Sequence, residues 1–342
     1  MSNSKYLDLL LLQYKPLHDA KKSIKKIYNL LAKAKVSKNA VVVCPELSIQ
    51  DYICIKKNKK LFREAIDISS STIKSMREIS IEFKIYLCIT IFSREKDNYF
   101  NKALIINPDG EIIQKYNKKN IPSEQCYQEK YYFNQPKNNF KFFDIGKFRI
   151  GILICWDQWY ARSYEYMRKN NVNLIICPTA IGFCKIKNKN ISLRGEREKW
   201  LNVITANSLM INTPVVICNR IGTESDKDHS ISFWGSSFIT DSSGTIVKRC
   251  LKDQRVIHHK IAIEDQITAK SMWNFIDLVL FRSLFCKINV SNHKSNDYNM
   301  TVESVLLSWR FYINENINVN VNALSNELFS VSTIFCKKFH SV

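Results

Sequence analysis

The chain has 342 residues, of which 45% are hydrophobic and 24% charged, with only 8 Gly and 7 Pro. These proportions exclude collagen-like, low-complexity and wholly disordered proteins, and the length allows a sizeable core. No apolar run approaches the roughly 20 residues of a membrane-spanning helix. Asp8 and Gln13 also interrupt the N-terminal apolar stretch, so we expect no signal peptide and no membrane association.

The formal net charge of +20 comes from 51 Lys and Arg against 31 Asp and Glu. The Lys residues are spread along the whole chain, and abundant Lys, Asn and Ile are what A/T-rich codons supply. Because no zinc finger, recognition helix or RNA-binding aromatic motif accompanies the charge, we expect no nucleic-acid partner. The chain also has 11 Cys and no secretory signal, which indicates a cytoplasmic protein whose thiols stay free.

The predicted elements alternate between strands and helices along the chain. Short runs rich in Val, Ile and Leu, typical of strands covered on both faces, span 6–13, 40–44, 84–91, 102–107, 149–155, 173–177 and 214–218. Segments with apolar residues at helical spacing span 20–35, 60–83, 161–170 and 193–211. Residues 107–110 and 241–244 have the composition of turns between paired strands. This alternation predicts an α/β fold.

The character of the chain changes near its C-terminal end. We predict one domain over residues 1–290, followed by a polar, Asn-rich extension over 291–342 with a helix near 302–312. The extension is either a dispensable tail, which we favour, or an arm that reaches a partner subunit.

Four predicted strands end in a Cys, namely Cys44, Cys155, Cys177 and Cys218. Functional sites of α/β sheets lie at the carboxyl ends of strands, so position makes each Cys a candidate nucleophile. The alternative is that each is a small buried hydrophobic residue, as free Cys usually is. The chain has no Cys-x-x-Cys pair and no His cluster with zinc spacing, so we expect no metal site.

A catalytic thiol needs a group that takes up its proton, and none of the six His has an evident partner. A carboxylate and a Lys are the remaining choices. Glu46 directly follows the strand predicted over 40–44, which places it at the same sheet edge as Cys155, and Lys118 lies in the loop 116–122. Taken singly, each of these charged residues has the character of an ordinary surface residue, and its spacing in the sequence alone does not identify it as catalytic.

Three segments resemble, in family order, the motifs of the nitrilase superfamily of carbon–nitrogen hydrolases: Pro45-Glu46-Leu47, Tyr116–Pro122 and Gly151–Trp159. The resemblance runs from about residue 6 to 282. It implies a four-layer αββα sandwich, a catalytic triad of Glu46, Lys118 and Cys155, and a homodimer or larger homo-oligomer. It also implies that Glu129 holds Lys118 charged and oriented, and that no cofactor is needed.

Three further blocks, at 127–133, 178–182 and 219–224, are similar to the branch of this superfamily that acts on N-carbamoylputrescine, and the block 233–238 completes the series of motifs. The implied reaction cleaves the ureido C–N bond of this small molecule through a Cys thioester and yields putrescine, CO2 and ammonia, a step of polyamine biosynthesis. Two alternatives stay open. The enzyme acts on another ureido or aliphatic amide substrate, such as a β-ureido acid, or the chain is a non-catalytic scaffold of this fold.

The chain departs from the family pattern near the expected site. Asn120 stands where the family usually has His, and Ser123 and Arg162 replace acidic residues. Carbamoylputrescine carries an ammonium group, which requires a carboxylate in the pocket because an unpaired buried cation is costly.

Glu124 is the nearest replacement acid in the Lys loop. We predict that Glu124 receives the ammonium while Tyr52 and Trp156 pack against the aliphatic chain of the substrate. The alternative is that Glu124 is a solvated loop residue and a backbone carbonyl serves as the anchor.

Overall fold

The computed structural model describes residues 5–137 and 139–262. The strands are β1 Tyr6–Gln13, β2 Val41–Val43, β3 Tyr86–Glu95, β4 Asn98–Ile106, β5 Ile112–Asn117, β6 Lys141–Ile145, β7 Phe148–Ile152, β8 Leu174–Thr179, β9 Gly182–Ile186, β10 Lys189–Asn190, β11 Val215–Asn219, β12 Ile221–Asp226, β13 His229–Trp234, β14 Phe238–Thr240, β15 Ile246–Arg249 and β16 Arg255–Ala262. The α-helices are α1 Ala20–Lys33, α2 Ser71–Phe83, α3 Glu129–Tyr132, α4 Ala161–Lys169 and α5 Glu196–Ile211, and the 3-10 helices are η1 Ile53–Ile55, η2 Lys59–Glu64 and η3 Cys155–Trp159.

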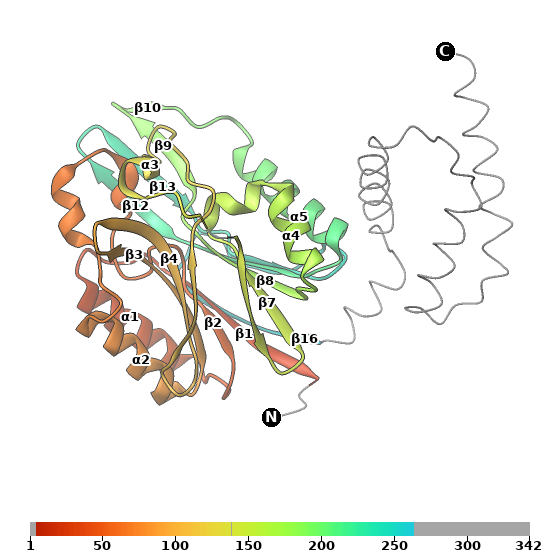
Figure 1. Cartoon of the computed structure of the whole chain (residues 1–342). Coiled ribbons are helices and arrows are strands. Elements are labelled where there is room, and N and C mark those ends of the chain that lie inside the picture. Colours follow the sequence, from red (N-terminus) through yellow and green to blue (C-terminus); the bar gives the residue numbers. More distant parts are fainter. Residues whose placement is uncertain (1–4, 138, 263–342) are drawn as a thin grey trace, which may run out of the picture. The chain divides into compact units, whose positions relative to one another are not determined.

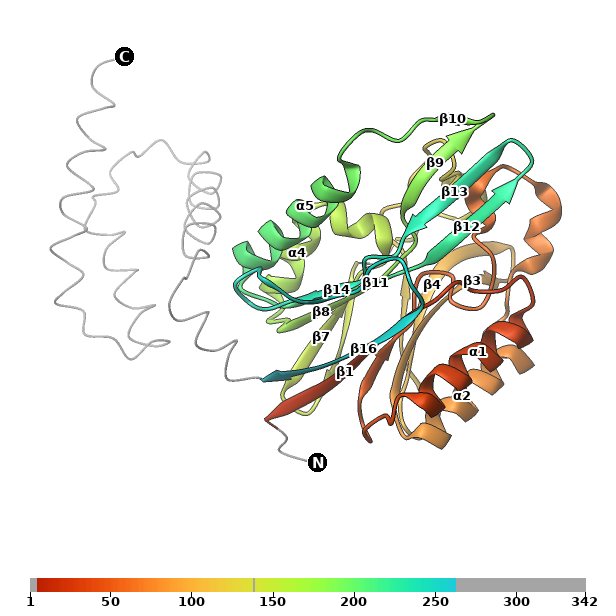
Figure 2. The ribbon, with the colours of Figure 1, turned by 180° about the vertical axis from the view of Figure 1, so that it is seen from behind.

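Two six-stranded sheets form the centre of the described part of the chain (Figures 1 and 2). One has the strand order β16-β1-β2-β3-β4-β5, and the other has the order β15-β14-β11-β8-β7-β6. Helices α1 and α2 cover the outer face of the first sheet, and α4 and α5 cover the outer face of the second. The chain therefore folds as the αββα sandwich that the sequence resemblance implied.

Strand β1 shows why the apolar runs form central strands. Leu9 and Leu11 belong to the core between the two sheets, whereas Leu10 and Leu12 pack in the core beneath α1 and α2. Because successive side chains of a strand point to opposite faces, a strand covered on both faces is apolar throughout. Helix α1 begins where the Asp19 carboxylate accepts hydrogen bonds from the first free backbone N–H groups.

The predicted helix over 60–83 is wrong in its first half. A short 3-10 helix, η2, is followed by extended chain in which Ile66 pairs with Ser93, and the α-helix begins only at Ser71. The Ile66 N–H donates to the carbonyl of Phe92 at 2.7 Å, so pairing with the edge of β3 replaces helical hydrogen bonds there. The tertiary contact outweighs the local helical pattern.

The two predicted turns join neighbouring strands as expected. Residues 107–110 link β4 to β5, and residues 241–244 link β14 to β15. A third sheet, with the order β10-β9-β13-β12, was not predicted, because its strands mix polar and apolar residues. Among the described residues, no helix is long and apolar enough to cross a membrane. The predicted extension 291–342 and its helix lie outside the described residues.

Candidate active site

The two sheets bring the ends of β2 and β7 together, and the sharp bends that follow these strands carry Glu46 and Cys155. The Glu46 N–H donates to the carbonyl of Thr179 at the end of β8, which ties the first sheet to the second. Cys155 begins η3 with a φ of +42°, and the next residue after Glu46, Leu47, has a φ of +50°. Such left-handed conformations are uncommon for residues other than Gly and concentrate at functional sites.

A buried cluster of charges lies at this edge. The Lys118 ammonium contacts Glu46 Oε1 at 2.8 Å and Glu129 Oε2 at 2.7 Å, and all three side chains have no solvent exposure. Asn101 on β4 donates a further hydrogen bond to Glu46 Oε1 at 2.7 Å. Among the described residues, Glu46 Oε2 has no hydrogen-bond partner. One oxygen of Glu46 is thus occupied, while the other is left free to accept a proton.

The electrostatics of the cluster follow from burial and from its excess of carboxylates. Burial lowers the pKa of Lys118, but Glu129 and Glu46 raise it further, so it stays well above its ordinary value. Burial also raises the pKa of the Cys155 thiol, as does Glu46, and Lys118 only partly opposes this. Cys155 therefore rests as a thiol, and a base must take its proton before it can attack.

Asp157, to which the sequence analysis assigned no role, joins the Lys loop to the Cys bend. Its Oδ1 accepts hydrogen bonds from the backbone and side-chain nitrogens of Asn120 at 2.8 and 2.9 Å. Its Oδ2 accepts from the hydroxyl of Tyr116 and the N–H of Ile154 at 2.7 and 3.0 Å. Arg162 donates to Asn120 Oδ1 at 2.6 Å, so two departures from the family pattern contact each other.

A cavity of about 450 Å³ opens at Cys155. Four aromatic residues, Tyr127, Trp156, Trp159 and Trp234, are among the residues that line it. The charged residues in its lining are Glu124 and Glu196, and no Lys, Arg or His of the described chain lines it. The cavity is acidic although the chain as a whole is strongly basic.

Two of the three predicted substrate-binding residues line the cavity at Cys155, and the third does not. Glu124 and Trp156 line the cavity beside Cys155. Tyr52 does not line this cavity; it is buried, and its hydroxyl donates to Glu129 Oε1 at 2.7 Å. The expectation that Tyr52 packs against the substrate chain is therefore corrected, because the hydroxyl is used to hold Glu129. Glu196, the first residue of α5, is a cavity residue that the sequence analysis missed.

The other three strand-end Cys lie away from the cavity lining. Burial raises the pKa of Cys44 to about 12, and it also raises the pKa of Cys177 and Cys218. Burial raises the pKa of Cys155 as well, so the pKa does not separate the four thiols. Cys44, Cys177 and Cys218 differ from Cys155 because they lie outside the cavity lining, and a reactive thiol must be accessible. The structure thus separates Cys155 from the other candidates by its place in the cavity.

The carbon–nitrogen hydrolase family model matches residues 11–270. The chain belongs to the carbon–nitrogen hydrolase family. A citrullinase of Francisella tularensis subsp. tularensis is 31% identical over 223 residues, which cover 65% of this chain and 77% of that protein. An N-carbamoylputrescine amidase of Oryza sativa subsp. japonica is 30% identical over 239 residues, which cover 68% of this chain and 78% of that protein.

The crystal structure of a carbon–nitrogen hydrolase from Helicobacter pylori G27 is similar to this chain with a TM-score of 0.73. That comparison has 25% sequence identity and covers 82% of this chain and 98% of the other. This member of the carbon–nitrogen hydrolase family is therefore an amidase-type hydrolase.

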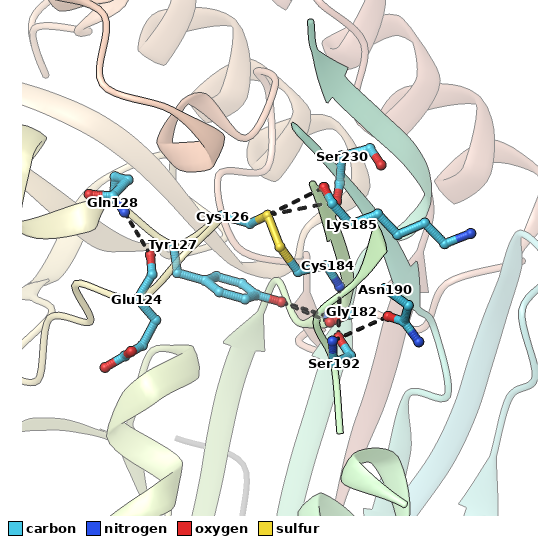
Figure 3. Close-up of a disulfide and its surroundings, with 10 residues drawn as sticks. All are labelled: Glu124, Cys126, Tyr127, Gln128, Gly182, Cys184, Lys185, Asn190, Ser192 and Ser230. Carbon is cyan, nitrogen blue, oxygen red and sulfur yellow. Dashed lines mark hydrogen bonds between the residues drawn. A yellow bond between two sulfur atoms is a disulfide. The ribbon is translucent and has the colours of Figure 1, made fainter. Parts of the chain in front are cut away.

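One feature of this carbon–nitrogen hydrolase contradicts the expectation of free thiols. Cys126 and Cys184 form a disulfide with a Cα–Cα distance of 6.1 Å, and Figure 3 shows it between the loop that carries Tyr127 and strand β9. Cys184 lines the cavity at Cys155, and the Tyr127 hydroxyl bonds to Gly182 at 3.0 Å. The disulfide therefore fastens two neighbouring parts of the cavity wall. The sequence could not show this pair, because its members are 58 residues apart.

Removing the disulfide is expected to destabilise this carbon–nitrogen hydrolase by about 2–4 kcal/mol, because a closed loop of this length restricts the unfolded chain. The comparison is between the wild type and a Cys126→Ala/Cys184→Ala variant in urea unfolding, each with and without reductant. Reductant should lower the unfolding midpoint of the wild type alone. Alkylation of both Cys126 and Cys184 in the unreduced, denatured wild type would contradict the pairing.

Proposed function

We propose that this protein hydrolyses the ureido C–N bond of N-carbamoylputrescine and so releases putrescine, CO2 and ammonia. The observation that carries the proposal is the charge of the cavity, whose charged lining residues are Glu124 and Glu196. Carbamoylputrescine has a neutral ureido group at one end and an ammonium at the other. Neither carboxylate has an ion-pair or hydrogen-bond partner among the described residues, so both are available to a cation.

The geometry of the buried cluster supports a role for each group. Glu46 Oε2 accepts the proton of the Cys155 thiol, and Sγ attacks the ureido carbonyl carbon. Lys118 donates to the oxyanion that develops. Glu46 then returns the proton to the departing ammonia, which leaves a substituted carbamoyl group on Sγ. Glu46 next activates a water molecule that hydrolyses this thioester, and the released carbamate breaks down to putrescine and CO2.

Glu129 keeps Lys118 in place during these steps. Its two oxygens are engaged separately, Oε2 by Lys118 and Oε1 by the Tyr52 hydroxyl. Because both contacts are buried, Glu129 is a fixed partner and does not compete for the thiol proton. The full set of contacts also argues against a non-catalytic scaffold, which has no need of a buried charge cluster with one free oxygen.

The competing substrates differ in charge. A β-ureido acid carries a carboxylate and needs a cationic anchor, and no Lys, Arg or His lines the cavity within the described chain. Citrulline, the substrate named for the Francisella tularensis relative, carries both an ammonium and a carboxylate. Measuring ammonia release from carbamoylputrescine, citrulline and β-ureidopropionate separates the three. We expect kcat/KM to be highest for carbamoylputrescine, and preference for β-ureidopropionate would overturn the proposal.

Glu124→Gln and Glu196→Gln are each expected to lower kcat/KM for carbamoylputrescine by about ten- to a hundredfold, as for a lost charged hydrogen bond. N-pentylurea, in which a methyl group replaces the ammonium, should be hydrolysed at nearly unchanged kcat/KM. Glu198→Gln is the matched control, because Glu198 lies in the same helical turn as Glu196 but is exposed and pairs with Arg197. Equal losses on both substrates would mean that these carboxylates do not recognise the charge.

A further inference from the structure

We propose that the buried ion pair of Arg220 and Glu224 is a positioning device that holds both catalytic carboxylates, Glu46 through its backbone and Glu129 through Tyr52. This inference goes beyond the proposed function, because it concerns how the Glu46 carboxylate is oriented toward the Cys155 thiol and not the identity of the substrate. It assigns Arg220 and Glu224 as positioning residues that act through other groups.

Arg220 holds the bend that presents Glu46. It lies between β11 and β12, and its side chain has no solvent exposure. Nη1 donates to the carbonyls of Glu46 and Leu47 at 3.1 and 3.3 Å, and Nη2 donates to the carbonyl of Gln50 at 3.1 Å. One side chain thus engages three carbonyls around Leu47, whose left-handed φ of +50° forms the bend. The strained bend persists because these contacts determine it.

Glu224 extends the device to the second carboxylate. Its Oε1 accepts from Arg220 Nη2, and its Oε2 accepts from the backbone N–H of Tyr52 at 2.6 Å. The Tyr52 hydroxyl donates to Glu129 Oε1, and Glu129 in turn contacts Lys118. Since Lys118 also contacts Glu46, the contacts close a ring that starts and ends at the Glu46 bend. Tyr52 is therefore held at both ends.

The device requires an arginine. A guanidinium offers five N–H donors in a rigid plane, whereas a lysine ammonium offers three donors at a single point. Three carbonyls and one carboxylate surround the guanidinium, which also lies over the ring of Phe233 at 5.2 Å. Lysine at position 220 would keep the charge beside Glu224 but could not reach all of the carbonyls. The conservative substitution therefore separates geometry from charge.

A displaced Glu46 affects the proton transfer more than it affects substrate binding. Glu46 Oε1 is held by Asn101 and Lys118, so a shift of the backbone rotates the free Oε2 away from the thiol. A misplacement of about 1 Å can cost on the order of 100-fold in rate. The cavity wall, which includes Trp156 and Glu196, does not contact Arg220 through any hydrogen bond in the described chain. We therefore expect kcat to fall while KM changes little.

The experiment compares Arg220→Lys with Arg168→Lys in the full chain. Arg168 on α4 also donates to a backbone carbonyl, that of Ile211 at 2.6 Å, but it lies outside the cluster and the cavity lining. Arg220→Lys should lower kcat by about 10- to 100-fold with KM within about twofold, while Arg168→Lys should keep both values. Tyr52→Phe, which removes only the hydroxyl contact with Glu129, serves as the milder variant if Arg220→Lys does not fold.

A second measurement keeps this test separate from the proposed function. The rate at which iodoacetamide alkylates Cys155, located by mass spectrometry, depends on removal of the thiol proton and requires no substrate. Arg220→Lys and Tyr52→Phe should both slow it. A folded Arg220→Lys protein with wild-type kcat and alkylation rate would overturn the inference, as would a raised KM at unchanged kcat. Failure of the wild type to hydrolyse carbamoylputrescine would overturn only the proposed substrate.

Discussion

Cys155→Ala is expected to abolish measurable hydrolysis, a loss of about 10⁴-fold or more, while the protein keeps its fold. Among the described residues, Cys155 and Cys184 are the Cys that line the cavity, and Cys184 is paired with Cys126. The substitution removes one sulfur from the cavity surface and leaves the contacts of Glu46 and Lys118 in place. Ammonia release and thermal unfolding measure the two parts of the expectation.

Cys250→Ala is the control, because Cys250 lies outside the cavity lining and should keep full activity. Mass spectrometry after treatment with a thiol-reactive substrate analogue provides an independent readout. The adduct should be found on Cys155. An adduct located mainly on Cys44, Cys177 or Cys218 would refute the assignment, since those thiols lie outside the cavity lining.

Lys118→Met is expected to lower the free energy of unfolding at pH 7 by about 3–5 kcal/mol, because it leaves two buried carboxylates without their cation. The same change removes the oxyanion donor, which lowers kcat by about 100- to 1000-fold. Lys119→Met is the matched control. Lys119 is the next residue in the sequence, but its ammonium donates to the exposed Asn139 Oδ1 at 2.6 Å and not to a buried carboxylate. Urea unfolding and steady-state kinetics of the two variants give the comparison.

The loss of stability in Lys118→Met should depend on pH in a defined direction. Burial raises the pKa of Glu129, and Lys118 opposes that shift in the wild type. Without Lys118 the folded-state pKa of this carboxyl rises further above its unfolded value, so the folded state takes up a proton as the pH falls. Because this pKa is about 7 in the wild type, the additional proton uptake of the variant occurs mainly above pH 7, and the difference from the wild type should therefore shrink as the pH falls from about 9 toward 7. A deficit that grows on acidification would show that the buried carboxylates are not its source.

The sequence by itself determined the layers of the fold. Strand β1 could be predicted at its observed bounds, Tyr6–Gln13, because Leu9–Leu12 is apolar at successive positions, as in a strand covered on both faces. The segments that carry Glu46, Lys118 and Cys155 were also identified from the sequence. They were identified by their resemblance to the motifs of the nitrilase superfamily, because spacing alone did not distinguish Glu46 and Lys118 from ordinary surface charges.

Only the tertiary structure decided the partners of these residues. Asn101 lay in no recognised segment, and Asp157 and Arg220 were members of family-like blocks without an assigned role. All three are buried, Asn101 and Arg220 against Glu46 and Asp157 against Asn120 of the Lys loop. A local pattern reports whether a face is buried, but a hydrogen-bond partner depends on which distant strands cross at that point. Arg220 and Glu46, for example, are 174 residues apart.

The same reason explains where the sequence analysis was wrong or incomplete. Tyr52 was expected to pack against the substrate chain, but Glu224 and Glu129 hold it and it does not line the cavity at Cys155. Glu196 was missed because a Glu in the first turn of a helix is common, and only the folded chain places it beside Cys155. Residue type and period determine the layers, whereas the charge of the cavity is set by residues that meet only when the two sheets and α5 have packed.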